Sequence, residues 1–387
     1  MSIIPLTDLK AQYKSIKEEI NSAIKKVLNE TDFILGKELS LLEEEIANYF
    51  GVKFAIGVAS GTDALVLSLV SLDIKKDDEV ITSPFTFIAT SEAIIRVGAK
   101  PVFSDIEYDT FNIDPKKIEE KITKNTKAII PVHLYGMPAK MDKIMEIARR
   151  YNLKVIEDCA QSFGAEYQGK KLGTFGDCAI LSFFPAKILG CFGDGGMVIT
   201  NNQEVAKKIK LIRNHGAEEK YYYKMHGFNS RLDTLQSAIL RVKLKYVDNW
   251  IDKRIENAKY YNALLSKCKE IITPSIPKTV KHSFNYYTIR VKNNKRNLIQ
   301  QRLKEKNIAS AIYYPLCLHL QDVYKDLGYK EGDFPVAEQA QDEVLSLPMY
   351  PELSKKQIEG IVKVILSNAS NNQILIGKNH KSLKINN

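Results

Sequence analysis

Short apolar runs rich in β-branched residues recur through the first half of the chain, and most are separated by segments with an apolar residue at every third or fourth position. The first pattern predicts buried strands and the second predicts amphipathic helices. Strands that alternate with helices favour a parallel sheet covered on both faces, and hence an α/β fold. The predicted strands are residues 54–59, 79–82, 100–106, 127–133, 154–158, 178–183 and 196–200. Helices predicted between them include residues 62–72, 89–97 and 141–151.

The segments on either side of this region show other patterns. Residues 1–50 contain two helical patterns, and a longer one covers residues 231–267. Farther on, strand-like runs at 281–291 and 308–315 flank a helix expected near 297–306. The expected organisation is a helical segment at 1–50 packed on a large α/β domain at 51–240, a smaller α+β domain at 241–368 and a mobile tail at 369–387.

Composition narrows the choice of partners. The 387-residue chain has 56 Lys and Arg against 46 Asp and Glu, a formal net charge of +10, which can attract nucleic acid, anionic membranes or phosphorylated small molecules. The lysines are scattered among acidic neighbours, which does not favour nucleic acid. No apolar run approaches the ~20 residues needed to cross a bilayer, and the first residues do not read as a signal peptide. We expect a cytoplasmic protein without a nucleic-acid or membrane partner.

The five cysteines form no CxxC pair. Neither a disulfide framework nor a zinc ribbon is expected from such spacing, and we expect no metal site.

Lys187 stands in the segment SFFPAKILGCFGDGG, between an apolar strand and a glycine-rich loop. A lysine among Phe183, Phe184 and Leu189 is costly to keep charged, so its pKa should fall or it should form a Schiff base. The glycines allow the backbone to approach a bound ring or phosphate. The alternative is a lysine whose stem covers an apolar loop while its ammonium stays in water.

Asp158 ends the predicted strand KVIED, at the edge of the sheet where α/β proteins bind ligands. By itself it could also be a helix N-cap. Lys187 and Asp158 together are the two residue types that pyridoxal phosphate (PLP) requires, an imine-forming lysine and a carboxylate that keeps the ring nitrogen protonated. The turn at residues 60–62 would present N–H groups and hydroxyls to a phosphate at a helix N-terminus, although such turns are also common without a ligand.

With these residues in view, the chain resembles the nucleotide-sugar aminotransferases of the DegT/DnrJ/StrS type, which are fold-type I PLP enzymes. The resemblance covers about residues 4–366. Its motifs are SGTDAL (60–65), TFIAT (86–90), VIEDCAQSFGA (155–165), SFFPAKILGCFGDGG (182–196), GFNSRLDTLQSAIL (227–240) and LSLPMYP (345–351).

The resemblance implies roles for particular residues. Lys187 would form the Schiff base and shuttle the proton, and Asp158 would pair with the ring nitrogen. Gln161 would contact the 3′-oxygen of the ring, and Phe87 would lie over the ring face. The phosphate would be held by Gly61, Thr62 and Ser182, joined by Asn229 from a second subunit. The implied assembly is a homodimer with shared active sites.

Substrate contacts are less clearly marked. Arg231, Tyr314 and His319 are the candidates. The chain also departs from the family pattern, because many members have Asn after the lysine and His before the Tyr-Pro of the small domain, where Ile188 and Tyr313 stand here. The second departure puts in doubt a sugar-hydroxyl contact by Tyr313.

The implied reaction is PLP-dependent transfer of an amino group, from glutamate, to a nucleotide-linked keto sugar, in the biosynthesis of an amino sugar for a surface polysaccharide or glycan. Asp63 and Phe184 match the branch that aminates C3 of the sugar, whereas members acting at C4 more often carry a small residue and His at these positions. We therefore expect a 3-keto sugar as the substrate, with a 4-keto sugar as the alternative.

Three other functions are also considered for this sequence. A fold-type I enzyme acting on amino acids would use an arginine for the α-carboxylate, for which Arg290 or Arg302 is available. A PLP-dependent sugar dehydratase would carry His in place of Lys187, so it is disfavoured. A non-catalytic, basic nucleotide-binding or nucleic-acid-binding protein would show no PLP absorbance.

Overall fold

The computed structural model describes residues 3–369, so the predicted mobile tail lies, apart from its first residue, outside the described residues. At its centre is a seven-stranded sheet with the order β1-β9-β8-β5-β4-β2-β3. Only β9 runs antiparallel to its neighbours. The strands are β1 (Phe54–Val58), β2 (Glu79–Thr82), β3 (Lys100–Phe103), β4 (Thr126–Ile129), β5 (Lys154–Asp158), β8 (Cys178–Ser182) and β9 (Gly196–Thr200). Each coincides with a predicted strand, and the mostly parallel sheet is confirmed.

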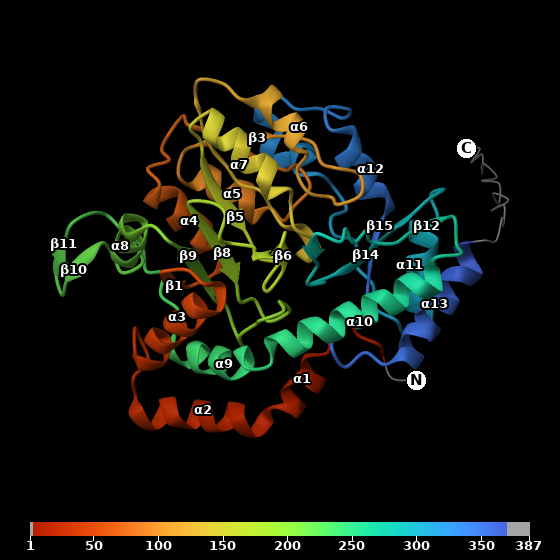
Figure 1. Cartoon of the computed structure of the whole chain (residues 1–387), viewed down its shortest axis with the longest axis horizontal. Coiled ribbons are helices and arrows are strands. Elements are labelled where there is room, and N and C mark those ends of the chain that lie inside the picture. The colour runs from red at the N-terminus through yellow and green to blue at the C-terminus, as the bar shows by residue number, and fades with distance from the viewer. Residues whose placement is uncertain (1–2, 370–387) are drawn as a thin grey trace, which may run out of the picture.

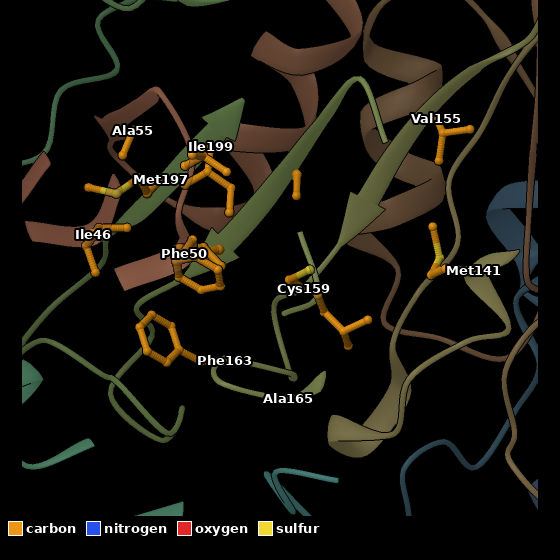
Figure 2. Close-up of a cluster of buried hydrophobic side chains, with 14 of the residues drawn as sticks. Ile46, Phe50, Ala55, Met141, Val155, Cys159, Phe163, Ala165, Met197 and Ile199 are labelled. Carbon is orange, nitrogen blue, oxygen red and sulfur yellow. The ribbon is translucent and has the colours of Figure 1, made fainter. Parts of the chain in front are cut away.

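Helices cover both faces of this sheet (Figure 1). Successive strand residues point to opposite sides, so Val155 belongs to one apolar cluster and Ile156 to the other. One face packs against α4 (Gly61–Ser71), α5 (Ala89–Arg96) and α8 (Gln203–Ile212). The other packs against α3 (Lys37–Phe50), α7 (Met141–Arg150), α9 (Thr234–Leu244) and α10 (Val247–Leu265). Part of this second cluster is shown in Figure 2, with Phe50 of α3 and Ile199 of β9 among its members.

The N-terminal helices are α1 (Leu9–Ser15) and α2 (Lys17–Glu30), followed by α3. Both α2 and α3 pack along α9, and α10 continues from there to α13 (Lys355–Ala369) in the C-terminal part of the chain (Figure 1). The single helical pattern predicted for residues 231–267 is therefore two helices, interrupted at residues 245–246. A hairpin of β10 (Ala217–Glu219) and β11 (Tyr222–Tyr223) extends away from the sheet.

The C-terminal part contains a three-stranded antiparallel sheet of β12 (Ile271–Ile272), β14 (Tyr287–Val291) and β15 (Val344–Leu347). Its helices are α11 (Arg296–Glu305), where a helix was predicted, α12 (Pro335–Glu343) and α13. Shorter elements are α6 (Pro115–Ile118), β6 (Glu166–Tyr167), β7 (Lys170–Lys171) and β13 (Val280–Lys281). The domain boundary expected at residue 240 stays a prediction.

The prediction of a strand at residues 308–315 is wrong. Apart from isolated bridges such as the one between Ala311 and Ser346, this segment has no strand pairing, and β15 pairs with β14 instead. The physical reason is that Tyr313 and Tyr314 line a cavity. Their aromatic character, which resembles that of a strand, belongs to a wall of this cavity. Within residues 3–369, no helix combines the length and the apolar composition that a membrane span requires.

Candidate active site

A cavity of about 560 Å³ lies at the carboxyl ends of β5 and β8, where the sequence placed the ligand site. Strands of a parallel sheet end at a common edge, which explains how residues far apart in the sequence meet here. The residues around it are Ser60, Gly61, Thr62, Leu65, Thr86, Phe87, Ala89, Thr90, Val132, Asp158, Ala160, Gln161, Ile180, Ser182, Phe184, Lys187, Asp194, Gly195, Tyr286, Tyr313 and Tyr314.

Lys187 lies in the loop that joins β8 to β9, and its side chain lines the cavity. The backbone N–H of Lys187 donates to the carbonyl of Phe184 (2.8 Å), which folds the loop back on the end of the strand. Burial lowers the pKa of Lys187 to about 8, although the negative charge of Asp158 opposes this shift. The neutral amine, which nucleophilic attack and proton transfer require, is therefore much more accessible near physiological pH than in an exposed lysine.

Asp158 is the last residue of β5 and is 4% exposed. Its Oδ2 accepts a hydrogen bond from Thr90 Oγ1 (2.9 Å), and its Oδ1 accepts one from the backbone N–H of Ala160 (3.1 Å). Burial raises the pKa of Asp158, while these two donors and the charge of Lys187 lower it. The carboxylate is thus held in a fixed position, in a setting where a cationic partner strengthens its ionised form.

The N-terminus of α4 forms another wall of the cavity. Ser60 caps this helix by accepting a hydrogen bond from the N–H of Asp63 (3.0 Å), and the first-turn N–H groups of Gly61 and Thr62 have no partner within the helix. A Cβ on Gly61 would lie 2.8 Å from Ser182 Cβ, so any larger residue would fill the space between helix and strand. The helix dipole, free N–H groups and the Ser182 hydroxyl together form a cradle suited to a phosphate.

The other predicted cofactor residues also reach the cavity. Phe87 lines it with 56% of its surface exposed, so its ring is available to a flat ligand. Gln161 is buried and donates from Nε2 to the Tyr314 hydroxyl (3.1 Å). A nucleophilic lysine, a buried carboxylate, an open aromatic face and an anion cradle all fit PLP by the chemistry of their groups.

Three predicted residues lie elsewhere on the chain. Asn229 is exposed and forms a bridge with Asn214, and Arg231 donates to Asn214 Oδ1 (3.0 Å). His319 is buried beside Glu338, with its Nε2 3.1 Å from the carboxylate. None of the three lines the cavity within this subunit. The Asn229 prediction invokes a second subunit, so this geometry does not test it, whereas no cavity contact supports His319 as a substrate residue.

Sequence reasoning assigned no role to Thr90, Asp194 or Tyr286, which all line the cavity. Thr90 ends the TFIAT motif, and Asp194 lies in the glycine-rich loop after Lys187. Their places in these motifs could have identified both as candidate site residues. Tyr286 had no such signal, because it precedes a strand and reaches the cavity only through tertiary packing.

Glu157 lies one residue before Asp158 and is fully buried. With His133 and Cys159 it forms a cluster whose atoms could reach a common ion. Its carboxylate already accepts hydrogen bonds from the N–H groups of residues 173, 175 and 176 and faces the His133 ring at 3.2 Å. These bonds give the cluster a structural role, in fixing the loops beside β5.

Three relatives are similar to this chain over nearly its whole length. A pleiotropic regulatory protein of Geobacillus stearothermophilus is 48% identical, with 94% of this chain and 97% of the relative covered. A UDP-N-acetyl-3-dehydro-α-D-glucosamine 3-aminotransferase of Acidithiobacillus ferrooxidans is 44% identical, with 94% and 97% covered. A dTDP-3-amino-3,6-dideoxy-α-D-galactopyranose transaminase of Aneurinibacillus thermoaerophilus is also 44% identical, with 94% and 99% covered.

The fold has a similar solved counterpart in DesV of S. venezuelae, crystallised in complex with a ketimine intermediate. The two share 38% identity, with a TM-score of 0.93 over 96% of this chain and 100% of the other. The model of the DegT/DnrJ/EryC1/StrS aminotransferase family matches residues 14–366. The cavity chemistry, the fold and the family match agree: the chain belongs to the DegT/DnrJ/EryC1/StrS family and is a PLP-dependent aminotransferase.

Proposed function

We propose that the enzyme transfers the amino group of glutamate to C3 of a nucleotide-linked 3-keto sugar. The observation that carries this proposal is the similarity, at 44% identity, to two transaminases whose names place the amine at C3 of a nucleotide sugar. Phe184 lies in the same loop as Lys187 and lines the cavity, and the resemblance associates Phe at this position with the branch acting at C3. An apolar ring at this position offers no hydrogen bond to the sugar, so the polar residues of the other walls must orient it.

The two arginines considered for an enzyme of amino-acid metabolism lie outside the cavity. Arginine is absent from the residues that line the cavity in the described part of the chain. Arg290 is buried elsewhere, where its guanidinium pairs with Glu343 (2.9 Å) and donates to the carbonyl of Tyr108 (2.7 Å). Arg302 pairs with Glu305 on the surface of α11. Neither of these arginines is placed to hold an α-carboxylate in the cavity.

The residues of this chain divide the work of transamination. PLP, when bound, supplies an electron sink that stabilises negative charge on the carbon that loses a proton. Lys187, with its lowered pKa, can accept that proton and return it to a neighbouring atom. Asp158 would provide the negative charge that the protonated ring nitrogen requires, and the N-terminus of α4 with Ser182 would hold the phosphate. Phe87 and Gln161 would orient the ring from its face and from its 3′-oxygen.

We further propose a homodimer in which Asn229 reaches the phosphate bound by the partner subunit. Asn229 is exposed and outside the cavity of its own subunit, which supports this placement. Arg231 and the tyrosine-rich hairpin lie on the same segment of the chain and are available to the substrate's nucleotide in such a dimer. A cytoplasmic location and a product used in a surface polysaccharide or glycan belong to the same proposal.

The decisive experiment locates the new amine. Purified enzyme with PLP and glutamate is incubated separately with 3-keto and 4-keto sugars carried on uridine and thymidine diphosphate, and the products are analysed by NMR. We expect nitrogen at C3 of a 3-keto sugar and no product from the 4-keto sugars. Clean amination at C4 alone would overturn the C3 assignment and favour the 4-keto alternative.

A further inference from the structure

A closed circuit of hydrogen bonds joins three distant segments at one wall of the cavity. Gln161 Oε1 accepts a hydrogen bond from the backbone N–H of Tyr135 (2.8 Å), and Gln161 Nε2 donates to the Tyr314 hydroxyl (3.1 Å). The Tyr135 hydroxyl donates to the backbone carbonyl of Tyr313, which is joined to Tyr314 by a peptide bond. The circuit therefore links the segment after β4, the loop after β5 and the segment between α11 and α12.

Packing holds every member of this circuit in place. Tyr135 is 3% exposed and its ring lies 5.5 Å from that of Phe111, edge to face. Its backbone has φ of 60°, an uncommon value for a bulky residue that persists only where the surroundings maintain it. The Tyr314 ring lies 6.1 Å from that of Phe85, also edge to face. Neither tyrosine can turn without giving up buried ring contacts.

These hydrogen bonds fix the orientation of the Gln161 amide. A glutamine amide has one accepting end and one donating end with two hydrogens. Tyr135 occupies the accepting end through its N–H, and Tyr314 takes one of the two hydrogens of Nε2. The other hydrogen stays available on a residue that lines the cavity. An amide held at one end only could rotate and present its oxygen instead.

We propose that Tyr314 and Tyr135 are positioning residues that hold the Gln161 amide so that its remaining N–H points to the ring oxygen of PLP. This inference rests on the proposed function, which assigns Gln161 to that oxygen. Burial, with Tyr286 as the next contribution, raises the pKa of Tyr314 far above its usual range. Its hydroxyl therefore stays protonated and serves Gln161 as a neutral acceptor at all working pH values.

The test uses the pH midpoint of the visible absorption band of the holoenzyme. Tyr314→Phe removes the hydroxyl and keeps the ring packing. A weaker hydrogen bond to the ring oxygen leaves more charge on that oxygen, which then holds the proton shared with the Lys187 nitrogen more tightly. We expect the midpoint to rise by about half a unit to one unit, which is the size of shift that the loss of one neutral hydrogen bond produces.

The matched control is Tyr313→Phe. It removes a neighbouring cavity hydroxyl but keeps the backbone carbonyl that closes the circuit, so the midpoint should stay unchanged. Tyr135→Phe removes the hydrogen bond from the Tyr135 hydroxyl to the Tyr313 carbonyl, keeps the bond from its backbone N–H to Gln161, and should raise the midpoint by a smaller amount. This variant also serves if Tyr314→Phe does not fold.

A double-variant experiment shows whether Tyr314 acts through Gln161. In the Gln161→Ala background, Tyr314→Phe should add no further shift. An equal shift in both backgrounds would mean that Tyr314 contacts the cofactor directly, and no shift in either would remove its role; both outcomes overturn the proposal. Borohydride trapping of PLP on Lys187 in the native protein keeps the two inferences apart, because failure of trapping refutes the assigned cofactor site itself.

Discussion

Thr90 Oγ1 donates a hydrogen bond of 2.9 Å to Asp158 Oδ2, and both residues are buried at the cavity. Thr90 belongs to α5 and Asp158 to β5, so this bond ties a helix to the end of a central strand. A hydroxyl donated to a carboxylate stabilises its ionised form. The bond therefore favours the charged form of Asp158 in a place where burial raises its pKa.

Thr90→Val should weaken catalysis by raising the pKa of Asp158 further. Because the ionised carboxylate is the active form, the acidic limb of the pH profile of kcat/KM should move to higher pH, by about one to two units for one hydrogen bond to a charged group. Thr90→Ser keeps the hydroxyl and should leave the limb in place. Identical acidic limbs in all three proteins would show that Thr90 does not set the charge of Asp158.

Lys187 should react with PLP at unusually low pH. Only the neutral amine adds to an aldehyde, and burial lowers the pKa of Lys187 to about 8. The rate of covalent attachment to the apoenzyme should rise with pH and level off above about 8, whereas an ordinary lysine would level off near 10.4. Stopped-flow absorbance measures this rate, and Lys187→Ala should show no attachment.

The same measurement tests the coupling between Lys187 and Asp158. The negative charge of Asp158 raises the pKa of Lys187 against the effect of burial. Asp158→Asn removes that charge, so the rate should level off at a lower pH than in the native protein. A shift to higher pH would contradict this electrostatic relationship.

The parts of this molecule that sequence could predict are those set by local patterns. Runs such as residues 178–182 are mostly apolar and short because they lie inside a sheet that is covered on both faces. Lys187 and Asp158 follow or end strands that a parallel fold must bring together at one edge. Tyr313 and Tyr314 misled the prediction because aromatic residues suit both a strand and a cavity wall. Tyr286 reaches the cavity only through the packing of the C-terminal part, which no local pattern records.

Arg290 should matter for stability and not for glutamate. Its side chain is 2% exposed and pairs with Glu343. The guanidinium carbon lies 3.9 Å from the centre of the Tyr108 ring and 4.6 Å from the centre of the Phe111 ring. Arg290→Lys cannot keep the planar stacking together with both hydrogen bonds, so the free energy of unfolding should fall by about 1–3 kcal/mol, as when a buried polar group loses its partner. Urea denaturation measures the loss, while KM for glutamate should stay within about twofold because Arg290 lies outside the cavity.

Arg302→Lys is the matched control, because Arg302 pairs with Glu305 on an exposed helix face. Its effect on the free energy of unfolding should stay below about 0.5 kcal/mol. A large rise in KM for glutamate in Arg290→Lys, with unchanged stability, would instead support an enzyme that binds an α-carboxylate through Arg290.

Shared active sites predict rescue between two inactive variants. If Asn229 reaches the partner's phosphate, Lys187→Ala and Asn229→Asp each disable a different half of the site, the second by placing a negative charge against the phosphate. In a heterodimer of the two, one composite site carries both native residues. Random mixing gives about half of the dimers as heterodimers, and each heterodimer has one native site out of two. About one quarter of native activity should therefore return.

The control for this experiment mixes Lys187→Ala with Asp158→Asn. Both residues line the cavity of the same subunit, so every composite site lacks one of them and no activity should return. Mixed dimers are verified by differently tagged subunits before the assay. Rescue in the first mixture and not in the second requires Asn229 to act across the interface, whereas equal behaviour of the two mixtures would place Asn229 outside the shared site.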